Sequence, residues 1–327
     1  MNNKFNIPVV LFTFKRSNTV ERILKVFKTV GVSKLYLFSD YGRNKEEKAL
    51  VEQTRKEILE MIDWDCEVIK KFATENKGVF NSIAMGAKEV FEVEDKAIFL
   101  EDDNLPEISF FRYCEEMLNK YQNNEDVIWI CGTNYESKSE YLDTDYIFTK
   151  HMLPCGWASW AHKFNKYYLA SFNILNNKNN IKKIKKAYEY KWLYSQQIRN
   201  FKMEKYREDH HRRYLSWDFH MAMSLRYFNK YGIAPKYNQI RNIGVDIHST
   251  HGGNSMKKPN TAKFCEIPTY ELPEILKGPE KVEINKIWEK NITKIVLVPL
   301  YIRLLFPFIT FTKKLLRMYP DKSFINK

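Results

Sequence analysis

Short apolar runs alternate with longer amphipathic stretches over the first hundred residues of the chain. The runs with the length and continuity of buried strands are residues 7–14, 34–39, 66–69 and 97–100. Between them, apolar residues recur at helical spacing over residues 20–30, 45–62 and 79–90. This alternation predicts four consecutive strand–helix units.

Strands that alternate with helices form a mostly parallel sheet with right-handed crossovers and helices on both faces. We therefore predict an α/β fold with a Rossmann-like central sheet. The pattern continues with an amphipathic helix at residues 110–121 and a strand at 127–131. The fifteen or so polar residues that follow are predicted to form a loop.

Ligands of such sheets bind beyond the carboxyl ends of the strands. Polar residues and glycine follow the predicted strands there, namely Thr13, Arg16, Asp40, Asn76, Gly78 and the acids 101–103. We expect these residues to meet in one crevice. The chain has no glycine-rich dinucleotide or P-loop fingerprint, which disfavours NAD enzymes and P-loop kinases.

Three consecutive acids, Glu101, Asp102 and Asp103, follow the fourth apolar run. Like charges at this spacing repel and raise one another's pKa, so a bound cation would stabilise them. Hard oxygen ligands suit Mg²⁺ or Mn²⁺, which complete their shells with water and phosphate oxygens. The triplet thus suggests a nucleotide diphosphate site, with a solvated loop after a strand as the alternative.

Aromatic residues and glycine are concentrated in residues 151–160, where Trp157 can stack on a sugar ring. Anchoring of this loop to the core is the alternative, and it applies more strongly to Trp160. Ser216 and Asp218 begin a further helix, and His248 and His251 lie in a glycine-rich loop.

The net charge of +13 is unevenly spread along the 327 residues. Residues 178–213 carry 12 Lys and Arg against 4 Asp and Glu, and residues 291–327 carry 7 against 1. Two basic regions on a near-neutral body imply anionic partners. The five cysteines form no CxxC pair, and the N-terminus does not predict a signal peptide, so we expect a cytoplasmic protein with reduced thiols.

The apolar run at residues 295–311 is shorter than a membrane-spanning helix and is interrupted by Pro299, Arg303 and Pro307. We predict a helix that lies on an anionic membrane surface, with packing on the body as the alternative. The predicted domains are residues 1–270, with halves 1–132 and 133–270 and a basic insertion at 173–213, and a helical tail at 271–327.

Several short segments occur in a specific order along residues 6–253, and this order resembles bacterial glycosyltransferases of the GT-A fold related to N-acetylglucosaminyltransferase I. The segments are TFKR, FSD, ENKG, EDDN, CGWASW, SWDFHM, NIG and HSTHGG. The Lys-rich insertion and the tail lie outside the resemblance.

The resemblance implies a role for each matched residue. Those implied to bind the nucleotide sugar are Thr13, Phe14, Arg16, Asp40, Asn76, Gly78, Glu101, Asp102 and Trp157. Asp103 would bind Mn²⁺ or Mg²⁺, with His251 or His248 completing the metal shell. Asp218 would be the general base.

We therefore predict an inverting glycosyltransferase that uses a nucleotide diphosphate sugar, with UDP favoured because Asp40 can accept from a uracil N–H. The acceptor would be a lipid-linked, lipopolysaccharide or other oligosaccharide, modified at the inner face of the cytoplasmic membrane. A sugar-1-phosphate nucleotidyltransferase is the alternative, although its glycine-rich loop is missing after the first strand. A non-enzymatic nucleic-acid-binding protein is a further alternative, but we expect no nucleic-acid partner.

Overall fold

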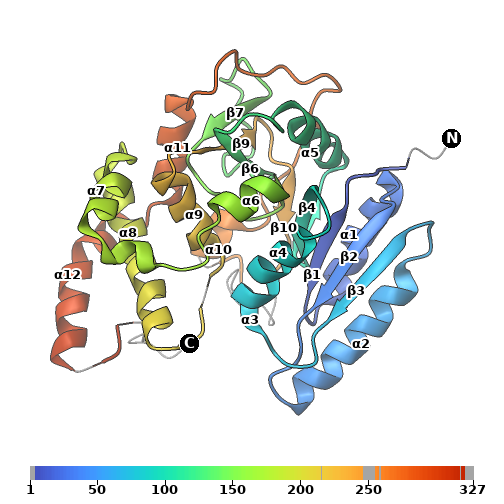
Figure 1. Ribbon diagram of the computed structural model, residues 1–327, viewed down its shortest axis with the longest axis horizontal. Helices are drawn as coiled ribbons and strands as arrows, with labels where there is room; N and C mark the ends of the chain where they lie inside the picture. The colour runs from blue at the N-terminus through green and yellow to red at the C-terminus, as the bar shows by residue number, and fades with distance from the viewer. Residues whose placement is uncertain (1–3, 215, 246–254, 258, 317, 321–327) are drawn as a thin grey trace.

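The computed structural model describes residues 4–214, 216–245, 255–257, 259–316 and 318–320. The strands of its main sheet are β1 (Val9–Thr13), β2 (Lys34–Ser39), β3 (Glu67–Phe72), β4 (Lys96–Glu101), β6 (Val127–Cys131), β7 (Tyr146–Thr149), β8 (Trp157–Trp160) and β9 (Tyr231–Pro235). They form one sheet in the order β3-β2-β1-β4-β8-β6-β9-β7, flanked by helices (Figure 1). The predicted α/β fold with a mostly parallel central sheet is confirmed.

The helices of the first half follow the predicted crossovers. They are α1 (Ser17–Val30), α2 (Lys45–Met61), the consecutive segments α3 (Gly78–Phe80), η1 (Asn81–Met85) and α4 (Gly86–Val90), and α5 (Ile108–Lys120). The side chain of Asn44 caps α2 by accepting the Glu47 amide, and Gly31 ends α1 in the left-handed conformation. β1 pairs in parallel with β2 and with β4, so the carboxyl ends of these strands lie at one edge.

The second half of the sheet was only partly predicted. The predicted loop after residue 132 contains β7, and residues 157–160 form β8, which pairs antiparallel with both β4 and β6. All four residues of each strand are buried. Strands this short do not display the alternation by which a strand is recognised in a sequence.

A separate ribbon of β5 (Asn104–Pro106) and β10 (Ile240–Asn242) lies just beyond β4. Its register places Asn242 opposite Asn104. The ribbon therefore carries the chain after residue 242 back to the three acids at the end of β4.

The basic insertion forms a small helical lobe. Its helices are η2 (Asn173–Asn176), α7 (Lys178–Lys186) and α8 (Lys191–Asp209), which follow α6 (Ala161–Tyr167) and pack near α9 (Asp218–Tyr227). A core of its own joins the lobe to α9 through Phe172, Leu175, Ile184, Ile198, Phe201, Ala222 and Met223. The lobe and α9 are thus held in a fixed relationship.

The C-terminal region contains α10 (Pro259–Phe264), α11 (Lys286–Val296) and α12 (Leu300–Leu315). Leu272, Leu276, Trp288 and Ile292 all belong to the cores on the two faces of the sheet, whereas α12 has no buried residue. Of the described helices, none alone is long and apolar enough to cross a membrane. α11 and α12 together have the necessary length and composition, but they are bent by 57°.

Candidate functional site

The ends of β1 and β4 are joined by an arginine and two acids. Arg16, which precedes α1, donates from Nη1 to Asp102 at 3.4 Å and to Asp103 at 3.2 Å. The backbone amide of Phe14 also donates to Asp102, at 3.1 Å. Three residues that the sequence placed in one crevice are therefore in direct contact, and Arg16 compensates part of the negative charge.

Asp103 is held on its other side by the β5–β10 ribbon. The Asn104 side chain donates to its carboxylate at 2.6 Å, and the Ile243 amide donates to its backbone carbonyl at 2.8 Å. Gly244 lies so close that a β-carbon there would overlap the Asp103 carboxylate. The NIG segment, residues 242–244, thus packs against the acids. Any residue larger than glycine at position 244 would displace the Asp103 carboxylate.

Glu101 lies at the centre of an acidic cluster and is partly buried. Burial raises its pKa well above the ordinary value of 4.5, and the charges of Asp103 and Asp102 raise this pKa further. The charge of Asp218, at the start of α9, also raises this pKa. The Trp217 indole donates to Glu101 at 3.3 Å. Sequence reasoning did not assign a role to Trp217.

Asp218 is the first residue of α9. Burial raises its pKa to about 6, with a smaller contribution from the charge of Glu204, while the amides of Asp218 and Phe219 act in the opposite direction. A carboxylate with this pKa is ionised at neutral pH and is a stronger base than an exposed aspartate. The position and the chemistry of Asp218 both suit a general base.

A second cluster forms where β2 and β3 end. The Asp40 carboxylate accepts the amides of Tyr41, Lys77 and Gly78 at 2.8, 2.8 and 3.0 Å, and the Asn76 side chain at 3.1 Å. Gly78 has a φ of 79° in this loop. The structure thus brings together Asp40, Asn76 and Gly78. Since four donors occupy the carboxylate, a direct bond from Asp40 to a base stays a prediction that requires this loop to open.

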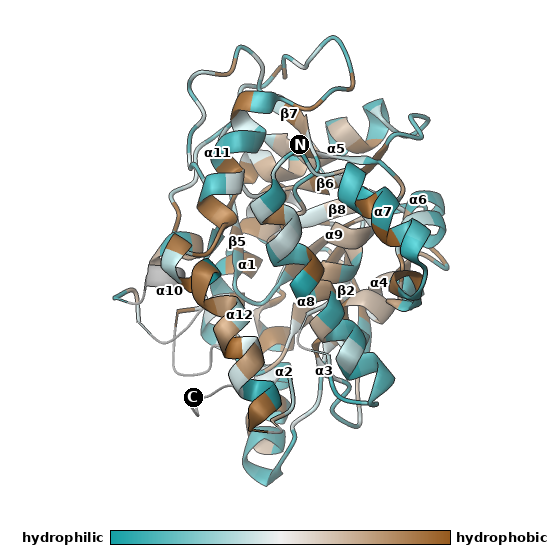
Figure 2. Ribbon diagram, turned by 90° about the vertical axis from the view of Figure 1, so that its left-hand side faces the viewer, coloured by the Kyte–Doolittle hydropathy of each residue, from teal (hydrophilic) through white to brown (hydrophobic). Residues whose placement is uncertain are grey.

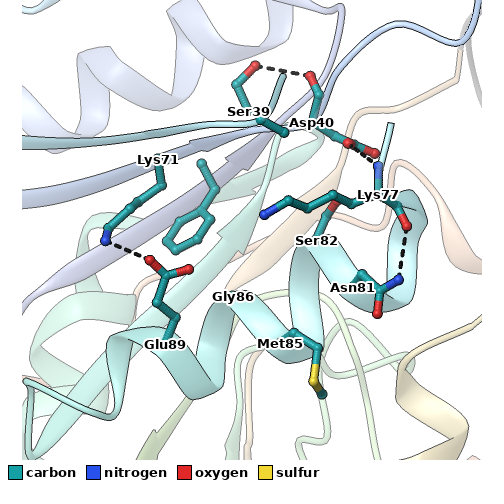
Figure 3. Close-up of a pocket in the computed structure, with 11 residues that line it drawn as sticks. Ser39, Asp40, Lys71, Lys77, Asn81, Ser82, Met85, Gly86 and Glu89 are labelled. Carbon is teal, nitrogen blue, oxygen red and sulfur yellow. Dashed lines mark hydrogen bonds and ion pairs between the residues drawn. The ribbon is translucent and has the colours of Figure 1, made fainter. Parts of the chain in front are cut away.

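A pocket lies beside Asp40, between the ends of β2 and β3 and the helix that begins at Gly78 (Figure 3). Its lining combines polar side chains such as Ser39, Ser82 and Asn81 with the apolar Met85. Lys71 and Glu89 form an ion pair of 2.6 Å across one side of it. This recess adjoins the second cluster.

Arg213 is a site residue that sequence reasoning missed. Its guanidinium donates to the side-chain amide oxygen of Asn76 and lies over Gly78, where a β-carbon would be 2.6 Å from Arg213 Nε. Within the described part of the chain, no acid forms an ion pair with Arg213. As one of 12 basic residues in residues 178–213, it carried no signal that distinguished it.

Two of the predicted binding residues have buried side chains, and the binding role of Thr13 stays a prediction. The Thr13 side chain is buried and donates to the Phe38 carbonyl at 2.9 Å, which joins β1 to β2. The prediction that Trp157 stacks on a sugar ring is wrong. Trp157 is 1% exposed, and its ring stacks between Phe99 and Trp129 with centroids 3.9 and 4.3 Å apart, so it cannot receive a sugar.

The prediction that His251 or His248 ligates a metal ion lies outside the described residues. Among the residues that the structure describes, no group of three or more His, Cys, Asp or Glu side chains is arranged to hold a metal ion. Mg²⁺, however, is commonly held by one or two carboxylates together with phosphate oxygens and water. Asp102 and Asp103 fit that donor set. The pKa of Glu101 is raised first by burial and then by the charges of these two acids, and a cation beside them would offset the charge contribution.

No protein-family model matches the chain, and no curated protein matches it. Solved structures similar to it include UDP-glucose pyrophosphorylase complexed with UDP-glucose, at 13% identity and a TM-score of 0.39, covering 72% of this chain and 93% of that chain. Another is 4-diphosphocytidyl-2C-methyl-D-erythritol synthase from Anaerococcus prevotii, at 14% identity, a TM-score of 0.29 and coverage of 53% and 78%. A third is HddC from Yersinia pseudotuberculosis complexed with GMP-PN, at 13% identity, a TM-score of 0.34 and coverage of 50% and 81%.

Proposed function

We propose that the protein is an inverting glycosyltransferase that uses a nucleotide diphosphate sugar and a divalent metal ion. The observation that carries this proposal is the hydrogen bond from Trp217 to Glu101, which brings the next residue, Asp218 at the start of α9, towards the acids at the end of β4. A base and a cluster of hard oxygen ligands are the two groups that such a transfer requires.

The donor would lie along the crevice between the two clusters. Its nucleoside would lie near the pocket beside Asp40, and its diphosphate would lie between Arg213 and Asp103. Mn²⁺ or Mg²⁺ held by Asp103 and Asp102 would neutralise charge on the departing diphosphate. Arg16 keeps both carboxylates in place through its bonds to them.

Asp218 would accept the proton of the acceptor hydroxyl. As the acceptor oxygen bonds to the anomeric carbon, the bond from that carbon to the diphosphate oxygen breaks on the opposite side. The proton remains on Asp218, the nucleoside diphosphate departs with the bonding electrons, and the anomeric configuration is inverted. Burial favours this role because it raises the pKa of Asp218 to about 6.

We favour a UDP sugar as the donor and a lipid-linked, lipopolysaccharide or other surface oligosaccharide as the acceptor, at the inner face of the cytoplasmic membrane. Two features support this choice of acceptor, namely the lysines of α7 and the exposed apolar side chains of α12. Both suit a substrate presented at an anionic surface.

Thermal-shift measurements with UDP, dTDP, GDP and CMP sugars, with and without Mn²⁺, test the proposal. We expect one base to raise the melting temperature in a metal-dependent manner, and Asp103→Ala to remove the metal dependence. The alternative nucleotidyltransferase would instead release pyrophosphate when a nucleoside triphosphate and a sugar 1-phosphate are supplied. That release, or the absence of any donor response, would refute the proposed reaction.

A further inference from the structure

The helix α12 is largely apolar, and Arg303, its one charged residue before the last turn, faces the protein. The Arg303 guanidinium lies over the Trp192 ring of α8 at 5.0 Å, and Arg199 lies over the Phe306 ring at 3.2 Å. Arg303 and Phe306 line a groove between α12 and α8. Arg303, the one charged residue among the three that interrupt the apolar run, is therefore turned away from the outer face of α12.

The outer face of α12 carries large apolar side chains that no other part of the described chain covers. They are between 49% and 72% exposed and comprise Leu300, Tyr301, Leu304, Leu305, Phe308, Phe311 and Leu315. Figure 2 shows α12 as a largely hydrophobic helix on the side that faces the viewer. A contiguous apolar stripe of this kind marks an interaction surface.

The segment that precedes α12, residues 296–298, is hydrogen-bonded to the rest of the protein, so the helix has a defined direction. The Gln196 side chain donates to the Val296 carbonyl and accepts the Val298 amide, both at 2.9 Å. Lys263 donates to the Leu297 carbonyl at 3.0 Å. Because Trp288 of α11 is fully buried, the bend between α11 and α12 begins at a rigid support.

A strongly basic helix lies on the same side of the molecule. α7 has no acidic residue and five exposed lysines, Lys178, Lys182, Lys183, Lys185 and Lys186. Figures 1 and 2 agree in placing α7, α8 and α12 on this side. The last turn of α12 adds Lys313 and Lys314.

We propose that this docking face, the outer residues of α12 together with the lysines of α7, binds the surface of an anionic phospholipid bilayer. The apolar side chains of α12 would lie among the lipid headgroups and the upper acyl chains, and the lysines would contact lipid phosphates. A two-fold dimer through the same face would enclose two copies of the lysine-rich α7 in one interface, and their like charges would repel. The charge distribution thus favours lipid over a second copy of the chain.

Co-sedimentation of the full chain with phosphatidylglycerol vesicles and with phosphatidylcholine vesicles tests this inference. We expect binding to phosphatidylglycerol that weakens with added salt, and much weaker binding to phosphatidylcholine. Leu304→Asp combined with Phe308→Asp should weaken binding by about tenfold or more, because it places charge in the apolar stripe.

Val93→Asp combined with Ile275→Asp is the matched control, since both residues are exposed and lie outside α7 and α12. It exchanges the same number of apolar residues and adds the same charge, and we expect it to bind as the unaltered chain does. Tyr301→Asp with Phe311→Asp is a second test pair on the stripe. Lys182→Ala with Lys186→Ala should reduce binding to phosphatidylglycerol specifically.

The inference is overturned if the chain does not sediment with phosphatidylglycerol, or if both stripe variants, shown to be folded by circular dichroism, bind as strongly as the control. It is also overturned if the stripe variants convert a dimer into a monomer and leave lipid binding unchanged. The assay needs no nucleotide. A failure here therefore leaves the thermal-shift response to nucleotide sugars, and with it the proposed reaction, unaffected, and removes only the support for an acceptor at the membrane.

Discussion

The Trp217 indole N–H donates to the Glu101 carboxylate at 3.3 Å, across 116 residues of sequence. This bond connects the start of α9 with the end of β4, so the residue after Trp217, Asp218, has a fixed place beside the acids. Trp217 is itself 3% exposed and lies 5.5 Å from Trp157, ring centroid to ring centroid. The core beneath the sheet therefore positions the proposed base.

Replacing Asp218 with asparagine should abolish most transfer and leave donor binding intact. Asparagine has a similar shape but cannot accept the hydroxyl proton, and general-base catalysis typically contributes about 10²- to 10⁴-fold. Transfer rates and donor affinity are measured on the same preparations. Asp143→Asn, at an exposed position, is the control. Equal loss of donor binding in Asp218→Asn would contradict the assigned role.

The pH dependence of transfer should follow the ionisation of Asp218. Because its pKa is raised to about 6, the base form predominates above that pH and is lost below it. We expect kcat/KM to fall about tenfold per pH unit on the acid side and to level off towards neutral pH. The residual rate of Asp218→Asn should lack this acid limb. A rate independent of pH between 5 and 7 would count against Asp218.

Glu101→Gln should make the protein more stable than the unaltered chain at neutral pH. The raised pKa of Glu101 means that the folded state holds its proton more tightly than the unfolded state does. This stabilisation is complete below the ordinary value of 4.5 and is lost as the pH rises through the folded-state pKa. Glutamine remains neutral, so the variant should gain stability relative to the unaltered chain as the pH rises.

Urea unfolding at acid and at neutral pH measures this difference. Glu92→Gln, an exposed exchange of the same kind, is the control and should show little pH-dependent change. Added Mg²⁺ should reduce the difference in unfolding free energy between Glu101→Gln and the unaltered chain, because the cation would compensate the negative charge of the acids around Glu101. If the unfolding free energies of Glu101→Gln and the unaltered chain differ by the same amount at every pH, the pKa of Glu101 is not raised in the folded state.

The sequence predicted the first half of the site because its signals are local. Asp40 and Asp103 each follow a buried strand closely, and this local pattern is enough to place them at the carboxyl edge of the sheet. The sequence did not identify Arg16 as the partner of Asp103, since that pairing depends on the register of β1 with β4. Arg213 likewise depends on how the basic lobe docks on the loop at Gly78.

Trp157 shows why a residue type can mislead. An aromatic residue beside glycine suits both a sugar platform and a buried strand, and the two differ only in the direction of the side chain. That direction is set by the pairing of β8 with β4, which places Trp157 opposite Phe99. All four residues of β8 are buried, so the strand shows no alternation of apolar and polar residues that would identify it in the sequence.

Trp157→Ala should therefore destabilise the fold rather than alter donor recognition. Truncation of a fully buried tryptophan commonly costs about 3–5 kcal/mol of unfolding free energy, because a large cavity remains. Trp192→Ala, at a position 48% exposed, is the matched control and should cost much less. Donor affinity of the folded fraction should not change. A selective loss of sugar binding without loss of stability would restore Trp157 as a binding residue.

Arg213→Ala should weaken binding of a nucleoside diphosphate much more than binding of the nucleoside. Within the described residues Arg213 has no acidic partner, so its charge is available to a phosphate, and hydrogen bonds to charged groups contribute about 1.5–3 kcal/mol. Calorimetric titration with the nucleoside and with its diphosphate separates the two contributions. Arg213→Lys should restore part of the affinity, and Arg22→Ala, at an exposed position of α1, should have no effect. If Arg213→Ala weakens both ligands equally and Asn76→Ala reproduces that loss, Arg213 supports the loop through Asn76 and does not contact the phosphates.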